Sequence, residues 1–168
     1  MFKSKDFIFM DVVSVEGKKI GFIKDLLINF NSGKVTGFEI SPYKFYHKNV
    51  SVLKEDIIYF NKHMVVKKIE KNKYLRLHSF INMDVIDKCR NVFGIVEDIT
   101  FTCDTFEIKG IIVSSGFIAN LLRGKRIMPI KELILGEENL LSLSNSDKYC
   151  FKSMPHNFFV KGKTYEKS

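Results

Sequence analysis

The residues of this sequence that could do chemistry are few and widely spaced, apart from two repeated Gly–Asp pairs. Gly21 stands four positions before Asp25, and Gly94 stands four positions before Asp98. Two carboxylates could act as a paired acid and base, or as metal ligands, if the fold brought them together. The structural alternative is that each short carboxylate accepts backbone N–H groups that a β-bulge leaves unpaired. We favour this alternative, because the two pairs belong to separate units of the chain.

The other reactive side chains give no catalytic or metal-binding pattern. Ser114-Ser115-Gly116 is typical of a strand end rather than of a nucleophile, and no phosphate-binding, nucleophile-elbow or HExxH motif occurs. The sequence therefore predicts no enzyme activity, no cofactor and no metal. The histidines lack a second His, Cys or carboxylate at ligand spacing: His47, His63, His78 and His156.

The cysteines and the absence of a long apolar run predict a cytoplasmic location. Cys89, Cys103 and Cys150 are odd in number and form no CxxC pair, which is typical of free thiols in a reducing compartment. The apolar stretch near the N-terminus is too short for a signal peptide. The longest uncharged run, Gly110–Leu122, is shorter than the roughly 20 apolar residues that span a bilayer.

Two basic clusters remain as candidate interaction sites. Tyr74 lies within the first, and aromatic side chains among cations can bind single-stranded nucleic acid. A solvated linker is the favoured explanation of the first cluster, and a helix C-terminus, which favours cations, explains the second without a ligand. The clusters are Lys67, Lys68, Lys71, Lys73 and Arg76, and Arg123, Lys125 and Arg126.

The formal charge of +8 is concentrated in the first half of the chain. Residues 1–78 carry 15 Lys/Arg and 8 Asp/Glu, whereas residues 79–144 carry 7 and 9 and residues 145–168 carry 5 and 2. This asymmetry favours an anionic partner for the first part or for the tail. A composition rich in Lys, Ile, Asn and Phe, as in an AT-rich genome, would produce the same excess without a partner.

The elements that must position these residues are repeated. A shift of 73 positions aligns residues 10–41 with residues 83–114 without a gap, and a second block, 48–57, aligns with 125–134 after four extra residues in the later copy. Such a repeat fixes the unit of folding. The identical pairs include Asp25/Asp98 and the glycines Gly21/Gly94 and Gly37/Gly110.

Short β-branched and aromatic runs separated by turns predict an all-β unit of about six strands. Residues 7–10 and 12–15 are expected to be strands, and the spacing of Ile23 and Leu26 predicts a bulge at Lys24-Asp25, repeated at Glu97-Asp98. Gly21 and Gly94 should then face packed neighbours. We expect Val at either glycine to destabilise mainly its own unit.

The second unit departs from the first at residues 115–124. Phe117, Leu121 and Leu122 form an apolar stripe and Gly124 is a helix stop, which predicts one or two helical turns that cap the barrel or the interface. The predicted organisation is a first domain at 1–68, a basic linker at 69–78, a second domain at 79–144 and a C-terminal tail at 145–168. Each domain should fill a small core, and the two should pack on each other.

The repeated segment, with Ile20-Gly21-Phe22-Ile23-Lys24-Asp25-Leu26 at its centre, resembles the PRC-barrel family. The resemblance covers both units and implies two tandem six-stranded β-barrels. In that family the barrel forms the cytoplasmic part of the photosynthetic reaction-centre H subunit and the C-terminal domain of a ribosome-maturation factor. The barrel also occurs in small bacterial proteins. The resemblance therefore implies an interaction module without shared catalytic residues. This chain lacks the membrane helix of the first setting and the separate N-terminal barrel of the second.

The sequence therefore favours a non-enzymatic adaptor that binds a protein or ribonucleoprotein. One alternative is direct binding of RNA or of the ribosome through the basic first domain and linker. The other is attachment to an anionic membrane surface through residues 67–76, or through Phe158-Phe159 beside Lys161 and Lys163. No small-molecule substrate is expected.

Overall fold

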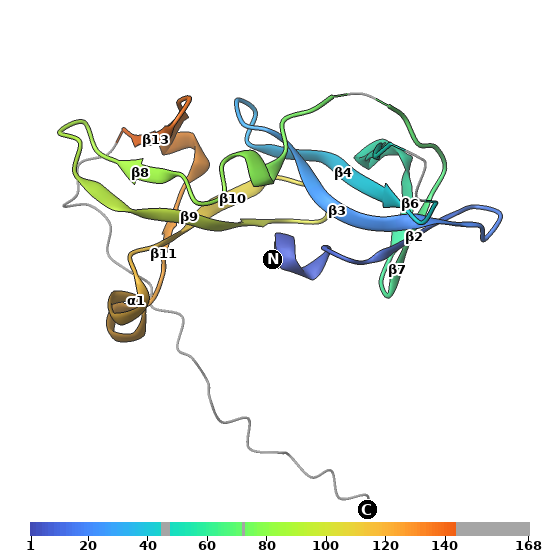
Figure 1. The fold of residues 1–168 in the computed structure, drawn as a ribbon, viewed down its shortest axis with the longest axis horizontal. Coiled ribbons are helices and arrows are strands. Elements are labelled where there is room, and N and C mark those ends of the chain that lie inside the picture. The colour runs from blue at the N-terminus through green and yellow to red at the C-terminus, as the bar shows by residue number, and fades with distance from the viewer. Residues whose placement is uncertain (45–47, 72, 144–168) are drawn as a thin grey trace, which may run out of the picture.

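The computed structural model describes residues 1–44, 48–71 and 73–143 (Figure 1). The predicted tail, residues 145–168, lies outside the described residues. Within them the chain is almost entirely β, with one short helix, α1 (Phe117–Arg123). The strands are β1 (Phe2–Lys3), β2 (Asp11–Ser14), β3 (Lys19–Asn29), β4 (Lys34–Pro42), β5 (Val50–Leu53), β6 (Ile57–Phe60), β7 (His63–Val66), β8 (Asp84–Ile86), β9 (Val92–Phe101), β10 (Ile108–Ser114), β11 (Arg126–Met128), β12 (Leu133–Leu135) and β13 (Asn139–Ser142).

The two units have the same topology. The first sheet runs β5-β4-β3-β2-β7-β6 and the second runs β11-β10-β9-β8-β13-β12, so each strand of one has its counterpart in the other. In both, a parallel pair (β2 with β7, β8 with β13) interrupts otherwise antiparallel pairing, and each sheet curls into a half-barrel. The predicted fold class, all-β with two tandem six-stranded barrel-like units, is confirmed.

The predicted bulges lie in the long central strands. Pairing between β3 and β4 shifts between Ile23 and Asp25, and pairing between β9 and β10 shifts between Val96 and Asp98. The extra residue lets the apolar residues on both sides of each bulge point inward. Ile23, Leu26, Val96 and Ile99 are all fully buried.

Residues 7–10, before β2, were predicted as a strand, and this prediction is wrong. Residues 7–10 are a turn after a short 3₁₀ helix, Ser4–Asp6, and the second copy repeats it after Leu77–Ser79. Phe9 has φ 68° and its counterpart Asn82 has φ 67°, a left-handed conformation that no strand allows. The run of apolar residues is typical of a buried strand, but only Phe7 is buried here. Phe9 is exposed to solvent.

Each unit extends its first residues onto the other unit. β1 pairs with β9, Lys3 opposite Thr100, and in the reciprocal contact Arg76 forms an isolated β-bridge with Leu27 of β3. The units also meet through Val35, whose N–H donates to the Phe106 carbonyl at 2.9 Å, and through Ile108, whose N–H donates to the Gly33 carbonyl at 2.8 Å. All four contacts obey the 73-residue offset, so the repeat is a pseudo-twofold pair.

This exchange corrects the expectation that each unit fills a core of its own. The buried apolar side chains form one cluster rather than two cores, with Phe7 against Phe101 at 5.5 Å between ring centroids. The described residues of the predicted linker, 69–71 and 73–78, are mostly exposed but make contacts with the folded body. Glu70 exchanges two backbone hydrogen bonds with Ser51, and Leu77 is buried.

The helix was predicted correctly, but its role was not. α1 covers neither the barrel nor the interface: it projects from the end of β10 beside β11 (Figure 1), and its apolar side chains are exposed. None of the helices among the described residues has the length and apolar character needed to cross a bilayer.

Candidate interaction surface

A lysine-rimmed hollow of about 740 Å³ lies at the end of the first unit and is called here the basic pocket. Apolar side chains and the Tyr43 ring form part of its wall, and lysine stems can extend along such a surface while the ammonium groups stay in water. The lining consists of Ser14, Glu16, Lys18, Lys19, Ile20, Pro42, Tyr43, Lys44, Lys48, Val50, Val66, Lys67, Lys68, Ile69 and Lys71.

Strand pairing brings these distant segments together. Parallel pairing of β2 with β7 sets Ser14 opposite Val66, so the β2–β3 turn lies beside the chain that leaves β7. The exchange between Glu70 and Ser51 then draws that chain along the edge of β5. Lysines from three parts of the sequence therefore face the same hollow.

The charge of the basic pocket is largely uncompensated. Its lining carries seven lysines against one carboxylate, Glu16. Ser14 Oγ donates to Glu16 Oε2 at 2.6 Å, and this hydrogen bond, with a contribution from Lys18, lowers the pKa of Glu16. Among the residues that the structure describes, none of the seven lysines forms an ion pair. Such a concentration of one sign of charge attracts anions.

The first predicted basic cluster is divided between two neighbouring hollows. Lys67, Lys68 and Lys71 line the basic pocket, whereas Lys73 and Arg76 line an adjoining hollow of about 490 Å³ that shares Lys48 and Lys71 with it. Arg76 is partly neutralised there, with Nη1 3.6 Å from Glu39 Oε1. Tyr74, the aromatic residue in this cluster, donates its hydroxyl proton to Glu70.

Sequence reasoning missed four lysines of the basic pocket: Lys18, Lys19, Lys44 and Lys48. None belongs to a dense charge run, so no local pattern marks them. The only sequence feature that includes these four lysines is the positive charge excess of residues 1–78.

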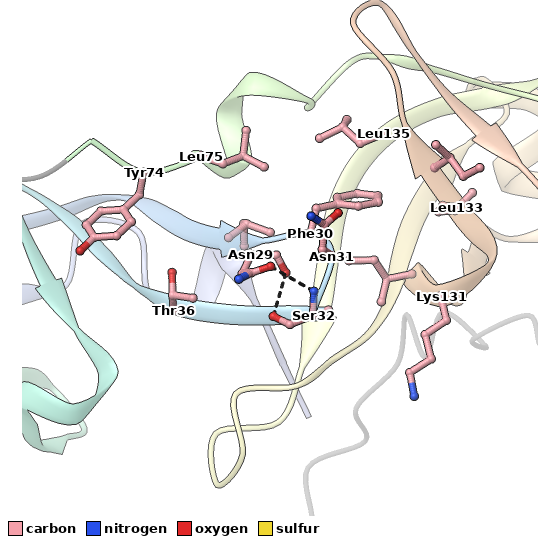
Figure 2. A pocket seen from close by; sticks show the side chains of 14 residues that line it. Asn29, Phe30, Asn31, Ser32, Thr36, Tyr74, Leu75, Lys131, Leu133 and Leu135 are labelled. Carbon is pink, nitrogen blue, oxygen red and sulfur yellow. Dashed lines mark hydrogen bonds between the residues drawn. The ribbon is translucent and has the colours of Figure 1, made fainter.

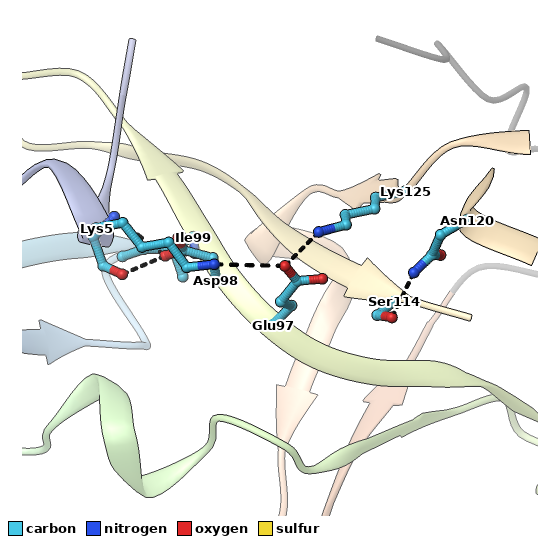
Figure 3. Close-up of polar contacts among 8 residues, drawn as sticks. Lys5, Glu97, Asp98, Ile99, Ser114, Asn120 and Lys125 are labelled. Atoms are coloured by element: carbon cyan, nitrogen blue, oxygen red, sulfur yellow. Dashed lines mark hydrogen bonds and ion pairs between the residues drawn. The ribbon is translucent and has the colours of Figure 1, made fainter. Parts of the chain in front are cut away.

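The second predicted cluster is held by contacts within the protein. Lys125 Nζ donates to Glu97 Oε1, and Lys5 Nζ lies 3.7 Å from the same oxygen (Figure 3). Burial works against the ionised form of Glu97, but the two lysines outweigh it and lower its pKa. The Arg126 guanidinium lies 5.6 Å from the centroid of the Phe93 ring. Arg123 is the last residue of α1.

The repeated aspartates are structural and lie in different sheets. Asp25 accepts the Leu26 N–H at 2.8 Å and, from the other unit, the His78 N–H at 3.3 Å. Asp98 accepts the Ile99 N–H at 2.8 Å, together with the N–H and hydroxyl of Ser4 (Figure 3). The interpretation as bulge acceptors is supported, and each carboxylate also reaches the start of the other unit.

The repeated glycines lie where strands approach closely. A Cβ on Gly21 or Gly37 would lie 2.1 Å from a carbonyl oxygen of the adjacent strand, and one on Gly94 would lie 2.2 Å from the Ser114 carbonyl oxygen. A Cβ on Gly110 would lie 2.5 Å from the Ile127 side chain. These four positions serve packing and contribute no functional group.

A second hollow, of about 690 Å³, lies between the two units (Figure 2). The β3–β4 turn forms one side, where Ser32 N–H donates to Asn29 Oδ1 at 3.0 Å, and β12 with Leu133 and Leu135 forms the other. Lys131 is the one charged residue of its lining.

Within the described ranges, no three His, Cys, Asp or Glu side chains gather into a group that could hold a metal ion. Cys89 and Cys103 are free thiols, and Cys150 lies outside the described residues.

The first unit matches a known protein family. The PRC-barrel domain family matches residues 1–75, which include β1 through β7. This family consists of small β-barrels that are often involved in protein interactions. No curated protein matches the chain.

Proposed function

We propose that this protein is a non-enzymatic adaptor that binds a protein or ribonucleoprotein partner through the basic pocket. The observation that carries the proposal is the uncompensated charge of seven lysines around a partly apolar wall. An adaptor needs complementary shape and charge, and this pocket offers both. We further propose that the second unit is a diverged PRC-barrel domain, since it repeats every strand pairing of the first sheet.

The lining favours an acidic protein segment that also carries an apolar side chain. Ile20, Val50 and Ile69 would cover an apolar residue, and the lysine ammonium groups would pair with flanking carboxylates. Lysine is a compact point charge without the planar fork that pairs bidentately with phosphate, and the lining contains no arginine.

RNA binding is the second candidate, because seven lysines on one surface would also attract a phosphate backbone. Tyr43 is the aromatic residue of the lining, and its hydroxyl donates to Asp11. One tethered ring gives little stacking surface for bases. The two candidates differ in the probe they bind.

The test compares two triple charge reversals. The pocket variant is Lys19→Glu, Lys67→Glu and Lys68→Glu, and the control is Lys24→Glu, Lys62→Glu and Lys88→Glu, three exposed lysines outside the pocket with the same change in charge. Fluorescence anisotropy would measure binding of an acidic peptide with one central Phe and of a mixed-sequence single-stranded RNA. Measurements at about 50 and about 200 mM salt separate electrostatic contributions.

The wild type and the control should bind the peptide, and the pocket variant should bind at least about tenfold more weakly, since each lost charge contact is worth a fraction of a kcal/mol to several kcal/mol. If the wild type binds RNA but not the peptide, and the pocket variant loses RNA binding, the proposal of a protein partner is wrong and RNA binding is supported. Equal binding by both variants, or no binding of either probe at the lower salt, would refute the role of the pocket.

A further inference from the structure

α1 presents its apolar side chains to solvent. Phe117, Ile118, Leu121 and Leu122 are 83%, 72%, 67% and 77% exposed, although the helix has only seven residues. A helix on the surface of a globular protein normally turns such a stripe inward. Contiguous exposed apolar patches of this kind mark interaction sites.

The outward orientation is fixed by the polar residue of the helix. Asn120 faces the sheet: its Nδ2 donates to Ser114 Oγ at 2.7 Å (Figure 3). Its Oδ1 accepts the Ser115 N–H at 3.1 Å. Gly124 closes the helix with φ 77° and donates its N–H to the Asn120 carbonyl at 2.9 Å. α1 is therefore held by its polar side, and its apolar side chains project from the body of the protein.

The connection that contains this helix is longer than its counterpart in the first unit. The first unit connects β4 to β5 through residues 43–49, whereas the second connects β10 to β11 through residues 115–125. The two sheets nevertheless have the same strand order. The second unit thus adds residues, and with them an apolar projection, without any change in strand order.

Cations and further apolar groups lie next to the projection. Lys125 and Arg126 follow the helix directly, and their contacts with Glu97 and Phe93 hold them near its C-terminal end. Ile127, on the following strand, is 40% exposed. Residues 79–144 carry 7 Lys/Arg against 9 Asp/Glu, but three of these cations, Arg123, Lys125 and Arg126, gather at the C-terminal end of α1. Exposed apolar side chains beside such a local group of cations match the surface of an anionic bilayer. A second copy of the chain would instead bring like charges together.

We propose that α1 is a membrane-surface anchor whose exposed Phe117, Ile118, Leu121 and Leu122 insert into the interface of a bilayer rich in anionic lipid. This site lies in the second unit and is independent of the basic pocket. An adaptor with both sites would hold its partner at a membrane surface.

Vesicle co-sedimentation tests the anchor with matched variants of the full chain. The α1 variant is Ile118→Glu with Leu122→Glu, and the control is Ile58→Glu with Ile134→Glu, two exposed apolar residues at 49% and 48% outside the helix. Both change the charge equally. The vesicles contain equal parts of phosphatidylglycerol and phosphatidylcholine, or phosphatidylcholine alone.

The wild type, the control and the triple pocket variant should sediment with the anionic vesicles, and the wild type should bind phosphatidylcholine poorly. The α1 variant should partition at least about tenfold more weakly, because two inserting side chains are lost. Equal partitioning of the α1 variant and the wild type, or loss in the pocket variant alone, overturns the proposal. So does a wild type that fails to sediment.

Fluorescence gives a second readout that does not depend on charge. The chain has no tryptophan, so Phe117→Trp places one reporter on α1 and Phe9→Trp places one on another exposed Phe. Anionic vesicles should shift only the emission of Phe117→Trp to shorter wavelength, and brominated lipid should quench it. If neither occurs, or if the α1 substitutions instead turn a dimer into a monomer without lipid, the helix serves a different contact.

Discussion

Asp25 and Asp98 occupy equivalent positions in the two units, and each carboxylate accepts hydrogen bonds both within its own unit and from the other unit. It accepts the N–H of the residue that follows it at the bulge, and it accepts an N–H at the start of the other unit, from His78 or from Ser4. A buried acceptor of this kind satisfies backbone donors that the bulge would otherwise leave unpaired. The pair of aspartates therefore joins the two units as well as shaping each strand.

Asp25 should make stability depend on pH in an identifiable way. Burial raises its pKa above the ordinary 3.8, against the opposing hydrogen bonds from Leu26 and His78. A carboxyl with a raised folded-state pKa stabilises the fold most below its ordinary pKa, and this contribution is lost as the pH rises through the raised value. Asp25→Asn keeps the acceptor oxygen and removes the charge, so its free energy of unfolding at pH 7 should equal or exceed that of the wild type.

Urea unfolding between pH 4 and 8 measures this effect. Asp25→Ala is the contrasting variant: it leaves the Leu26 and His78 N–H groups without an acceptor and should unfold about 1–3 kcal/mol more easily than Asp25→Asn. An Asn variant clearly less stable than the wild type at pH 7 would mean that the charge itself is needed.

At the scale of the element, the central hairpin of each sheet depends on close approach of two backbones. A Cβ on Gly21 would lie 2.1 Å from the Ser41 carbonyl oxygen, so Gly21→Val must push β4 away from β3. Gly94 meets Ser114 in the same way, and its φ of 147° also strains any other residue. Both substitutions should lower the free energy of unfolding by about 1–3 kcal/mol or more.

Lys19→Val provides the control for the glycine variants. Lys19 lies on the same strand β3 and is exposed, so Val should be neutral or slightly stabilising there. Guanidinium unfolding monitored by circular dichroism compares the three variants. Equal stability of Gly21→Val and Lys19→Val would show that β4 can move at little cost.

At the scale of the whole molecule, the shared core changes the expectation that each unit fails separately. Phe7 stacks on Phe38 of its own unit and packs against Phe101 of the other, so the cluster crosses the boundary. Removing apolar volume from either unit should then weaken one common structure. The reciprocal pairing of β1 with β9 and of Arg76 with Leu27 acts in the same direction.

Calorimetry on equivalent core substitutions tests this coupling. Leu26→Ala and Ile99→Ala, at fully buried positions related by the repeat, should each cost about 2–5 kcal/mol and lower the midpoint of a single transition. The calorimetric and van't Hoff enthalpies should agree, as they do for two-state unfolding. Two resolved transitions, of which only one moves, would show that the units fold independently.

The sequence alone determined the features that depend on local pattern and on the repeat. The bulges at Asp25 and Asp98 and the helix stop at Gly124 follow from residue spacing and from backbone conformations that glycine adopts easily. Internal repetition then predicted two equivalent all-β units, because a sequence period sets a structural period.

Only the tertiary structure decided which faces are covered. Phe9 and the stripe on α1 are apolar enough to be buried, yet neither is, because burial depends on which distant segments cover a surface. The gathering of Lys18, Lys44 and Lys67 around one pocket likewise requires strand pairing between segments far apart in the chain. Local propensity carries no information about such contacts, and for this reason the exchanged N-terminal segments and the basic pocket were not predicted.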